Sequence, residues 1–185
     1  MRRKDRQMDK EFALKVIDES QYASLGLVTD TGVMLRVLSV VRKDSRLYFH
    51  SATKGSKVDA FKDGQEVELT FVARAQVPNL FSREEIKELI DQGQASQLLS
   101  KVFTSEFSSA MVRGSLRRVT DKKEIEEALR IIGEKYTPDM MEFIEIAVEI
   151  SRDRVAIFAV EIEDIMAKRK MFDDEGEEMK WGRKS

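Results

Sequence analysis

The chain has 185 residues, of which 42% are hydrophobic and 36% charged, with a net charge of −2. This length suits one domain, or one domain with an appended helical piece, and the near balance of charge excludes a general electrostatic binder of nucleic acid. Because there is no cysteine and only one histidine, disulfides, thiolate metal sites and His-rich metal clusters are excluded. No apolar run approaches the roughly 20 residues that span a bilayer, and the basic N-terminus is not followed by an apolar signal core. We therefore expect a cytoplasmic protein with no metal site and no membrane or nucleic-acid partner.

The first part of the chain predicts one helix and then an antiparallel meander. Residues 1–8 are basic, and they either fray or form an arm that contacts a cofactor phosphate or a partner subunit. Asp9 is suited to cap a helix over residues 10–20. Short turns separate strands at residues 22–29, 33–42 and 47–51, and a fourth strand follows at 66–76.

The strand at 33–42 is apolar on both faces, with Ser39 on one face and Arg36 on the other as exceptions among residues 33–41. An antiparallel strand with one solvent-exposed face alternates apolar and polar residues. We therefore expect both faces to be covered, one by a barrel interior and the other by a helix, a second subunit or a bound ring system. Arg36 needs an anionic partner in this setting, either a neighbouring carboxylate or a ligand phosphate.

Residues 78–104 break the strand pattern with two predicted helices. One starts at the capping box Ser82-x-x-Glu85, and the other covers 95–102. This insertion acts either as a lid over a site or as a packing element. The pattern then predicts a strand at 106–118, a helix at 121–133, a helix starting at Thr137-Pro138 and a closing strand at 155–162.

About six antiparallel strands joined by tight turns, with helices between them, predict an α+β fold. We expect a closed or split β-barrel with Greek-key-like strand order and peripheral helices, since closure removes open sheet edges. Residues 1–170 form this domain, with 78–104 as a helical insertion. Residues 171–185 form a charged tail, ordered only if Trp181 finds a pocket.

The stretch from Leu47 to Lys57 has the order of parts that an anion site needs. A buried strand ends in a loop with Gly55, and Ser56 and Lys57 begin a short helix. Glycine lets backbone N–H groups turn toward a ligand, and a helix N-terminus favours negative charge. Lys54 and Lys57 add cationic donors. The alternative is an ordinary solvated turn.

The run Tyr48-Phe49-His50-Ser51-Ala52-x-x-Gly55-x-Lys57 resembles the flavin-binding segment of the flavin split-barrel superfamily. That superfamily includes the pyridoxamine-phosphate-oxidase-related proteins and the nitroimidazole-resistance (Nim) proteins. The opening Met1–Arg6 and the later Phe107–Gly114 are also similar to the Nim branch, and the likeness covers residues 1–76 and 105–168.

The resemblance implies one FMN per subunit, seated at a homodimer interface. Carried over position by position, Arg36 and Lys57 hold the 5′-phosphate of FMN, and Ser56 and the N–H groups near Gly55 complete that cradle. His50 stacks on the flavin, donates a proton to a reduced substrate or only shapes the pocket, and no residue is assigned as catalytic. The remaining implied contacts are backbone groups of Val37, Leu38 and Ser39 at the isoalloxazine edge, His50, Ser51 and Ala52 beside the ring and ribityl chain, and Ser109 reaching in from the neighbouring strand.

The chain departs from the Nim pattern in two places. Val37 stands where that pattern often has proline, which alters the strand at the ring edge. Phe107-Ser108-Ser109 stands where the pattern has Tyr-Arg-Ser, which removes a charge from the implied substrate contacts. No signature for pyridoxamine phosphate is present, so vitamin B6 oxidase activity is not expected.

The resemblance implies an FMN-dependent reductase of nitroaromatic compounds or other small electron acceptors, in which the protein orients the flavin and excludes water. NAD(P)H is a candidate electron donor, although no G-x-G-x-x-G dinucleotide fingerprint appears. One alternative is a flavin- or haem-binding module that stores or senses its cofactor without fast turnover. A third reading is a barrel that binds only a protein partner.

Overall fold

The computed structural model describes residues 3–180. Arg2 of the basic N-terminus and Trp181, Arg183 and Lys184 of the tail lie outside the described residues, so the expectations for them stay predictions. In chain order the elements are the 3₁₀ helix η1 (Lys4–Arg6), β1 (Gln7–Met8), α1 (Lys10–Glu19), β2 (Ala23–Thr29), β3 (Gly32–Leu38), β4 (Val41–Lys43), β5 (Arg46–Ala52), α2 (Ser56–Ala60), β6 (Gln65–Gln76), α3 (Arg83–Asp91), α4 (Ser96–Lys101), β7 (Glu106–Arg118), α5 (Lys122–Tyr136), the 3₁₀ helix η2 (Pro138–Phe143), α6 (Ile144–Ser151) and β8 (Val155–Lys170).

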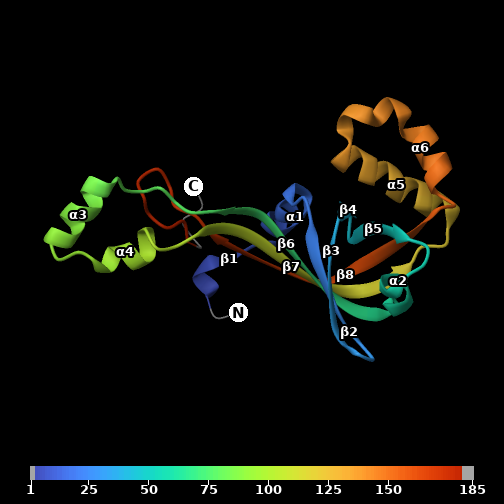
Figure 1. Cartoon of the computed structure of the whole chain (residues 1–185), viewed down its shortest axis with the longest axis horizontal. Coiled ribbons are helices and arrows are strands. Elements are labelled where there is room, and N and C mark those ends of the chain that lie inside the picture. Colours follow the sequence, from blue (N-terminus) through green and yellow to red (C-terminus); the bar gives the residue numbers. More distant parts are fainter. Residues whose placement is uncertain (1–2, 181–185) are drawn as a thin grey trace.

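The strands form one antiparallel sheet in the order β3-β2-β6-β7-β8-β5-β4, and the short β1 adds to β8. The two ends of this path, β3 and β4, are consecutive in the chain and are joined only by Ser39 and Val40, so the sheet curls round on itself (Figure 1). Among residues 3–180, β3 pairs only with β2 and β4 only with β5, so a split remains between β3 and β5. The predicted α+β split barrel is confirmed.

Two apolar clusters hold the barrel together. The larger one fills the interior, where Leu25, Leu69 and Phe49 are fully buried, and α1 covers it. Helix α1 starts where the sequence predicts, because Asp9 accepts a hydrogen bond from the Phe12 N–H at 2.9 Å. The smaller cluster lies between α5 and the outer face of the β4–β5–β8 region.

The strand predicted at 33–42 is in fact two strands that bend at Ser39–Val40. The bend lets β3 pair with β2 while β4 pairs with β5, so one run of apolar residues serves two parts of the barrel. Its outward face on β3 is not covered within the described chain, since Val33, Leu35 and Val37 are 66–74% exposed.

Two other predicted boundaries are wrong. Gly133 does not end its helix, because α5 continues to Tyr136. A Cβ at this position would meet Ile144 Cδ1 at 2.5 Å, so a larger residue would require the Ile144 side chain to shift. The closing strand runs past Ile162 to Lys170, because its pairing with β7 resumes after a register shift opposite Arg113–Gly114.

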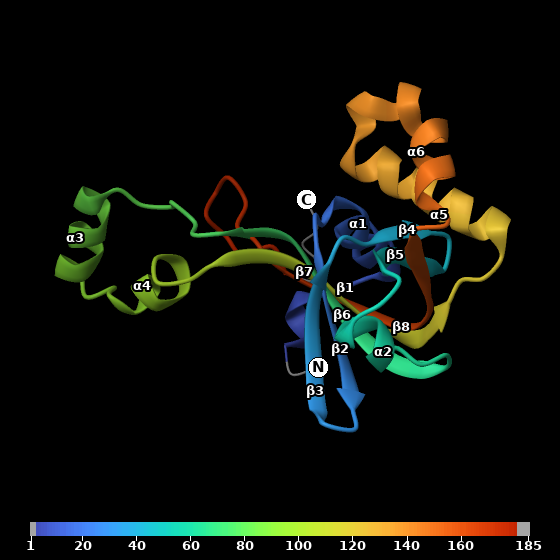
Figure 2. The ribbon, with the colours of Figure 1, turned by 45° about the vertical axis from the view of Figure 1, so that its right-hand side comes forward.

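The insertion at 78–104 forms an arm. Strands β6 and β7 carry α3 and α4 away from the barrel at one end of the molecule, as Figures 1 and 2 both show. The predicted capping box is present, since Ser82 Oγ accepts the Glu85 N–H at 3.2 Å and the Glu85 carboxylate accepts the Ser82 N–H at 2.7 Å. Among residues 3–180, no helix has the length and apolar character needed to cross a membrane.

Candidate functional site

The two segments predicted to hold a cofactor flank the barrel split. The ladder between β4 and β5 ends at the pair Val41–Tyr48. From that pair, one side of the split continues into residues 36–39 and the other into residues 50–57, because β3 turns away to pair with β2. Both predicted segments therefore adjoin the split.

Aromatic packing fixes the β5 side of the split. Phe49 is fully buried and stacks on Phe158, with ring centroids 5.5 Å apart. Phe61 meets these two rings edge-on at 5.8 and 5.0 Å. Because Phe61 directly follows α2, the three rings hold α2 and the loop before it against the end of β5.

The loop before α2 turns at Gly55 and leads directly into the helix. Gly55 has φ +122°, a region that side chains rarely adopt, and no atom outside its immediate chain neighbours lies within 4 Å of a Cβ built there. Asp59 N–H donates to Gly55 O at 3.0 Å, which starts α2. In the described part of the chain, no hydrogen bond is recorded from the N–H groups of Ser56, Lys57 or Val58, so these donors point from the helix start toward solvent.

Arg36 lies opposite Leu25 in the β2–β3 ladder, so it shares the face of β3 that turns toward the barrel interior. Its Nη1 donates to Leu35 O at 2.8 Å. No carboxylate of residues 3–180 forms an ion pair with it. Of the two partners expected for this charge, the neighbouring carboxylate is therefore not present in the described chain.

His50 and Ser51 point to opposite faces of β5, because successive strand residues alternate. Ser51 shares the interior face with Phe49, and its Oγ is buried without a hydrogen-bond partner. Burial and the nearby Lys57 ammonium lower the pKa of His50 below its usual value. The imidazole is therefore largely neutral at pH 7, and Lys57 lies close enough to act on it.

Ser109 is not brought to the split, and the expectation that it reaches in from a neighbouring strand is wrong within one chain. Strand β8 lies between β7 and β5. Ser109 pairs with Lys168 while His50 pairs with Ile157, a separation of roughly 35 Å along β8 at about 3.3 Å per residue. Ser109 instead lies opposite Val72 in the β6–β7 ladder.

Two residues that the sequence analysis missed hold the bend between β3 and β4. The Tyr136 hydroxyl accepts the Val40 N–H at 2.9 Å and donates to Gln21 O at 2.8 Å. Lys135 Nζ donates to the backbone oxygens of Ile17 and Val40 at 3.2 and 3.0 Å. The bend at Ser39–Val40 directly follows Val37 and Leu38, so α5 helps to hold one side of the split in place. No motif marks this role, since the pair stands at the end of an ordinary amphipathic helix.

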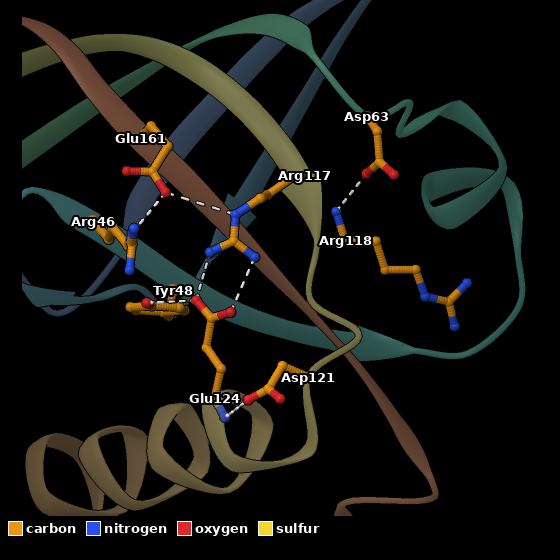
Figure 3. Close-up of polar contacts among 8 residues, drawn as sticks. All are labelled: Arg46, Tyr48, Asp63, Arg117, Arg118, Asp121, Glu124 and Glu161. Carbon is orange, nitrogen blue, oxygen red and sulfur yellow. Dashed lines mark hydrogen bonds and ion pairs between the residues drawn. The ribbon is translucent and has the colours of Figure 1, made fainter.

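A charged network lies under α5, on the far side of β5 from the barrel interior (Figure 3). The Glu124 carboxylate accepts from Arg117 at 2.5 and 3.1 Å and from the Tyr48 hydroxyl at 2.8 Å. Arg46 and Arg117 also pair with Glu161, at 2.6 and 3.6 Å. The Arg117 guanidinium lowers the pKa of Glu124. Every charge in this network has a partner, so it ties α5 to three strands and leaves no group free for a ligand.

Five surface cavities are described for residues 3–180. None of these five, of about 300 to 540 Å³, is lined by Arg36, His50 or Lys57. The largest of them follows the outer faces of β2, β3 and β6.

Residues 9–169 match the sequence model of a family described as Pyridoxamine 5'-phosphate oxidase. No protein of curated function matches the sequence. Among similar solved structures is a candidate 5-nitroimidazole antibiotic resistance protein from Bacteroides thetaiotaomicron, with TM-score 0.62, 20% identity and coverage of 88% of this chain and 86% of the other. The FAD and heme binding protein from Mycobacterium smegmatis has TM-score 0.68, 14% identity and coverage of 89% and 73%. The flavocytochrome Anf3 from Azotobacter vinelandii has TM-score 0.65, 17% identity and coverage of 96% and 74%. At these identities the likeness shows the fold alone.

Proposed function

Because the chain belongs to the pyridoxamine 5'-phosphate oxidase family, we propose that it is an FMN-dependent oxidoreductase. Its proposed substrates are nitroaromatic compounds or other small electron acceptors, and NAD(P)H is the proposed donor. The similar structures named for FAD and heme support a flavin in this fold. The observation that carries the proposal is a pair of cations, Arg36 and Lys57, that flank the split without carboxylate partners among residues 3–180.

The residues around the split fit the parts of FMN. Arg36, Lys57 and the free N–H groups at the start of α2 suit a phosphate dianion. The buried Ser51 Oγ lacks a partner and suits a hydroxyl of the ribityl chain. FMN, when bound, supplies the electron-transfer chemistry.

Strand β3 suits the edge of the flavin ring. It pairs on one side only, with β2, so its other edge presents unpaired backbone N–H and C=O groups at Val37–Ser39. Tyr136 and Lys135 hold the chain immediately after these residues and thereby orient them. His50, neutral at pH 7, lines the opposite side of the split, where it shapes the pocket or exchanges a proton with substrate.

The second wall of the site comes, in this proposal, from a second copy of the chain. The outer face of β2 and β3 exposes Val28, Val33, Leu35 and Val37 by 66–74%. Apolar patches of this kind mark interaction surfaces. Light scattering of the purified protein is expected to give a dimer, and Leu35→Glu is expected to give a monomer.

The test of the cofactor site is FMN affinity. Arg36→Gln and Lys57→Gln are each expected to weaken FMN binding by about 1.5–3 kcal/mol, which is roughly a 10- to 150-fold rise in Kd. Lys62→Gln is the matched control, since Lys62 is an exposed lysine shortly after α2 that pairs with Asp30, and we expect little change there. Unchanged affinity in both test variants would remove these cations from the phosphate site.

Turnover separates the oxidoreductase from a flavin- or haem-binding storage module, the second candidate that the similar heme-binding structures favour. The oxidoreductase is expected to show flavin absorption that bleaches with NADH or NADPH without oxygen. The colour is expected to return when a nitro compound is added. Cofactor binding without this cycle would favour the storage module.

A further inference from the structure

Among the polar and charged residues that are buried in residues 3–180, two have side-chain atoms without the hydrogen bonds that burial calls for. One is Ser51, which lies at the split. The other is Arg169 on β8, which is 7% exposed and whose Nε and Nη2 atoms have no hydrogen-bond partner in the described chain. The next residue, Lys170, is equally buried but donates to Thr104. Since native proteins rarely bury a charge without a partner, Arg169 needs an explanation.

The two unpartnered nitrogens lie on one edge of the Arg169 guanidinium, and this edge matches the two oxygens of a carboxylate. Three other arginines of the chain use the same edge. The Nε and Nη2 atoms of Arg3, Arg42 and Arg130 each donate to both oxygens of a single carboxylate, at 2.5–3.0 Å. Arg169 offers the same pair of donors, and nothing among residues 3–180 accepts from them.

Arg169 also lines a cavity of about 320 Å³ between the start of α1 and β8. Its guanidinium lies over the Phe12 ring, 5.7 Å from the ring centroid. Burial lowers the pKa of Arg169, and no carboxylate of the described residues offsets this effect. The cation therefore lies at a cavity wall without a counterion. The residues that line the cavity are Met8, Asp9, Glu11, Phe12, Lys15 and Arg169.

We propose that the cavity beside Arg169 is a second ligand site, which binds a small carboxylic acid through the Nε–Nη2 edge. The side chains of Met8 and Phe12 suit the apolar body of such an acid. A single negative charge is favoured over a phosphate dianion, because the Asp9 and Glu11 carboxylates lie in the same wall and repel a second charge.

The ligand displaces a side chain when it binds, because both nitrogens are shielded from solvent. Phe12 is the side chain that moves, since it is partly buried, lines the cavity and lies against the guanidinium. The carboxylate of the ligand then meets Arg169 edge-on, in the geometry that Asp18 has on Arg42.

This site is separate from the flavin site proposed at the split. Arg169 follows Lys168 on β8, whereas His50 pairs with Ile157 of the same strand. The separation is roughly 40 Å along β8 at about 3.3 Å per residue. The second site therefore does not depend on the proposed flavin chemistry.

Calorimetric titration of the full chain with acetate, hexanoate and benzoate, in a buffer without carboxylates, tests the site directly. At least one acid is expected to bind, and more tightly than inorganic phosphate does. Arg169→Gln is expected to weaken this binding by about 10- to 100-fold, and Arg169→Lys, which keeps the charge but not the paired donors, by about 10-fold. Arg42→Gln is the matched control and is expected to change nothing, because Asp18 already fills its edge. Failure of all three acids to bind, or tighter binding of phosphate, would overturn the proposal.

Thermal unfolding without ligand tests the unpaired charge itself. Burial of an unpaired cation is costly, so Arg169→Met is expected to raise the Tm by about 2–4 °C. Arg42→Met is expected to give no rise, since it removes a paired charge. A lower Tm in Arg169→Met would make Arg169 a structural residue and contradict the proposal.

FMN titration separates this site from the split. FMN affinity is expected to stay unchanged in Arg169→Gln, and acid binding is expected to stay unchanged in Lys57→Gln, because effects of distant substitutions are independent. Loss of FMN affinity in Arg169→Gln, or competition between the acid and FMN, would place Arg169 in a flavin site and overturn the second site. Absence of FMN binding together with normal acid binding would contradict the proposed function alone.

Discussion

Two polar regions on either side of β5 differ in whether their charges are paired. Under α5, the Glu124 carboxylate accepts hydrogen bonds from Arg117 and Tyr48. The Glu161 carboxylate forms ion pairs with Arg46 and Arg117. At the split, Arg36 and Lys57 have no carboxylate partner in the described chain, and the Ser51 Oγ is buried without a hydrogen bond. A folded chain usually pairs its partly buried charges within the protein, unless a ligand or a partner subunit supplies the opposite charge. The difference indicates a structural role for the first region and supports the ligand site proposed for the second.

The largest expected effect comes from breaking the paired region. Glu124→Gln is expected to lower the free energy of unfolding by about 2–3 kcal/mol at pH 7, because Arg117 loses the nearer of its two charged partners in a half-buried site. FMN affinity is expected to stay unchanged. Urea unfolding and FMN titration measure the two quantities.

The pH dependence of this effect has a definite sign. Arg117 lowers the pKa of Glu124 in the folded state, so the stabilisation is fully present above the unfolded carboxyl pKa of about 4.3. It is lost as pH falls through the lower folded value. The gap between the native protein and the variant is thus expected to close in acid. Glu127→Gln is the control, since Glu127 pairs with Lys43 in an exposed setting, where about 0–1 kcal/mol is typical. Equal losses in both variants would contradict the assignment.

The sequence predicts the barrel well because strands and tight turns leave local signals. It also predicts that residues 36–39 and 50–57 belong to one site. This prediction comes from the resemblance to a family motif, because the spacing of the two segments in the chain does not indicate it. It could not predict that Ser109 lies far from His50, since strand order across β8 is a property of the whole sheet. Lys135 and Tyr136 were missed for the same reason, because their partners at Val40 and Gln21 are about a hundred residues away.

A middle-sized effect is expected where the two regions meet. Tyr136→Phe removes the acceptor of the Val40 N–H, and Val40 is 1% exposed. An unpaired buried donor costs about 1–3 kcal/mol, so we expect a loss of about 1–2 kcal/mol in the free energy of unfolding. FMN affinity is also expected to fall, because Val37–Ser39 directly precede this bend. Tyr22→Phe is the control, since Tyr22 is 61% exposed. A loss of stability with unchanged FMN affinity would limit Tyr136 to a structural role.

The smallest expected effect is a shift in the titration of His50, which NMR follows cleanly because the chain has one histidine. Burial and the Lys57 ammonium both disfavour the imidazolium, so its pKa is expected below the usual 6.5. The corresponding stability is present above the unfolded pKa of about 6.5 and is lost as pH falls through the folded value. Lys57→Gln is expected to raise the pKa of His50, whereas Lys54→Gln is expected to leave it unchanged.

Added FMN turns this titration into a test of the ligand site. A phosphate dianion beside Lys57 cancels the charge that lowers the pKa of His50, so FMN is expected to raise that pKa in the native protein. The rise is expected to vanish in Lys57→Gln at equal flavin occupancy. If the pKa of His50 changes neither in Lys57→Gln nor on addition of FMN, Lys57 faces away from the split. The unpaired charges at the split would then need another explanation.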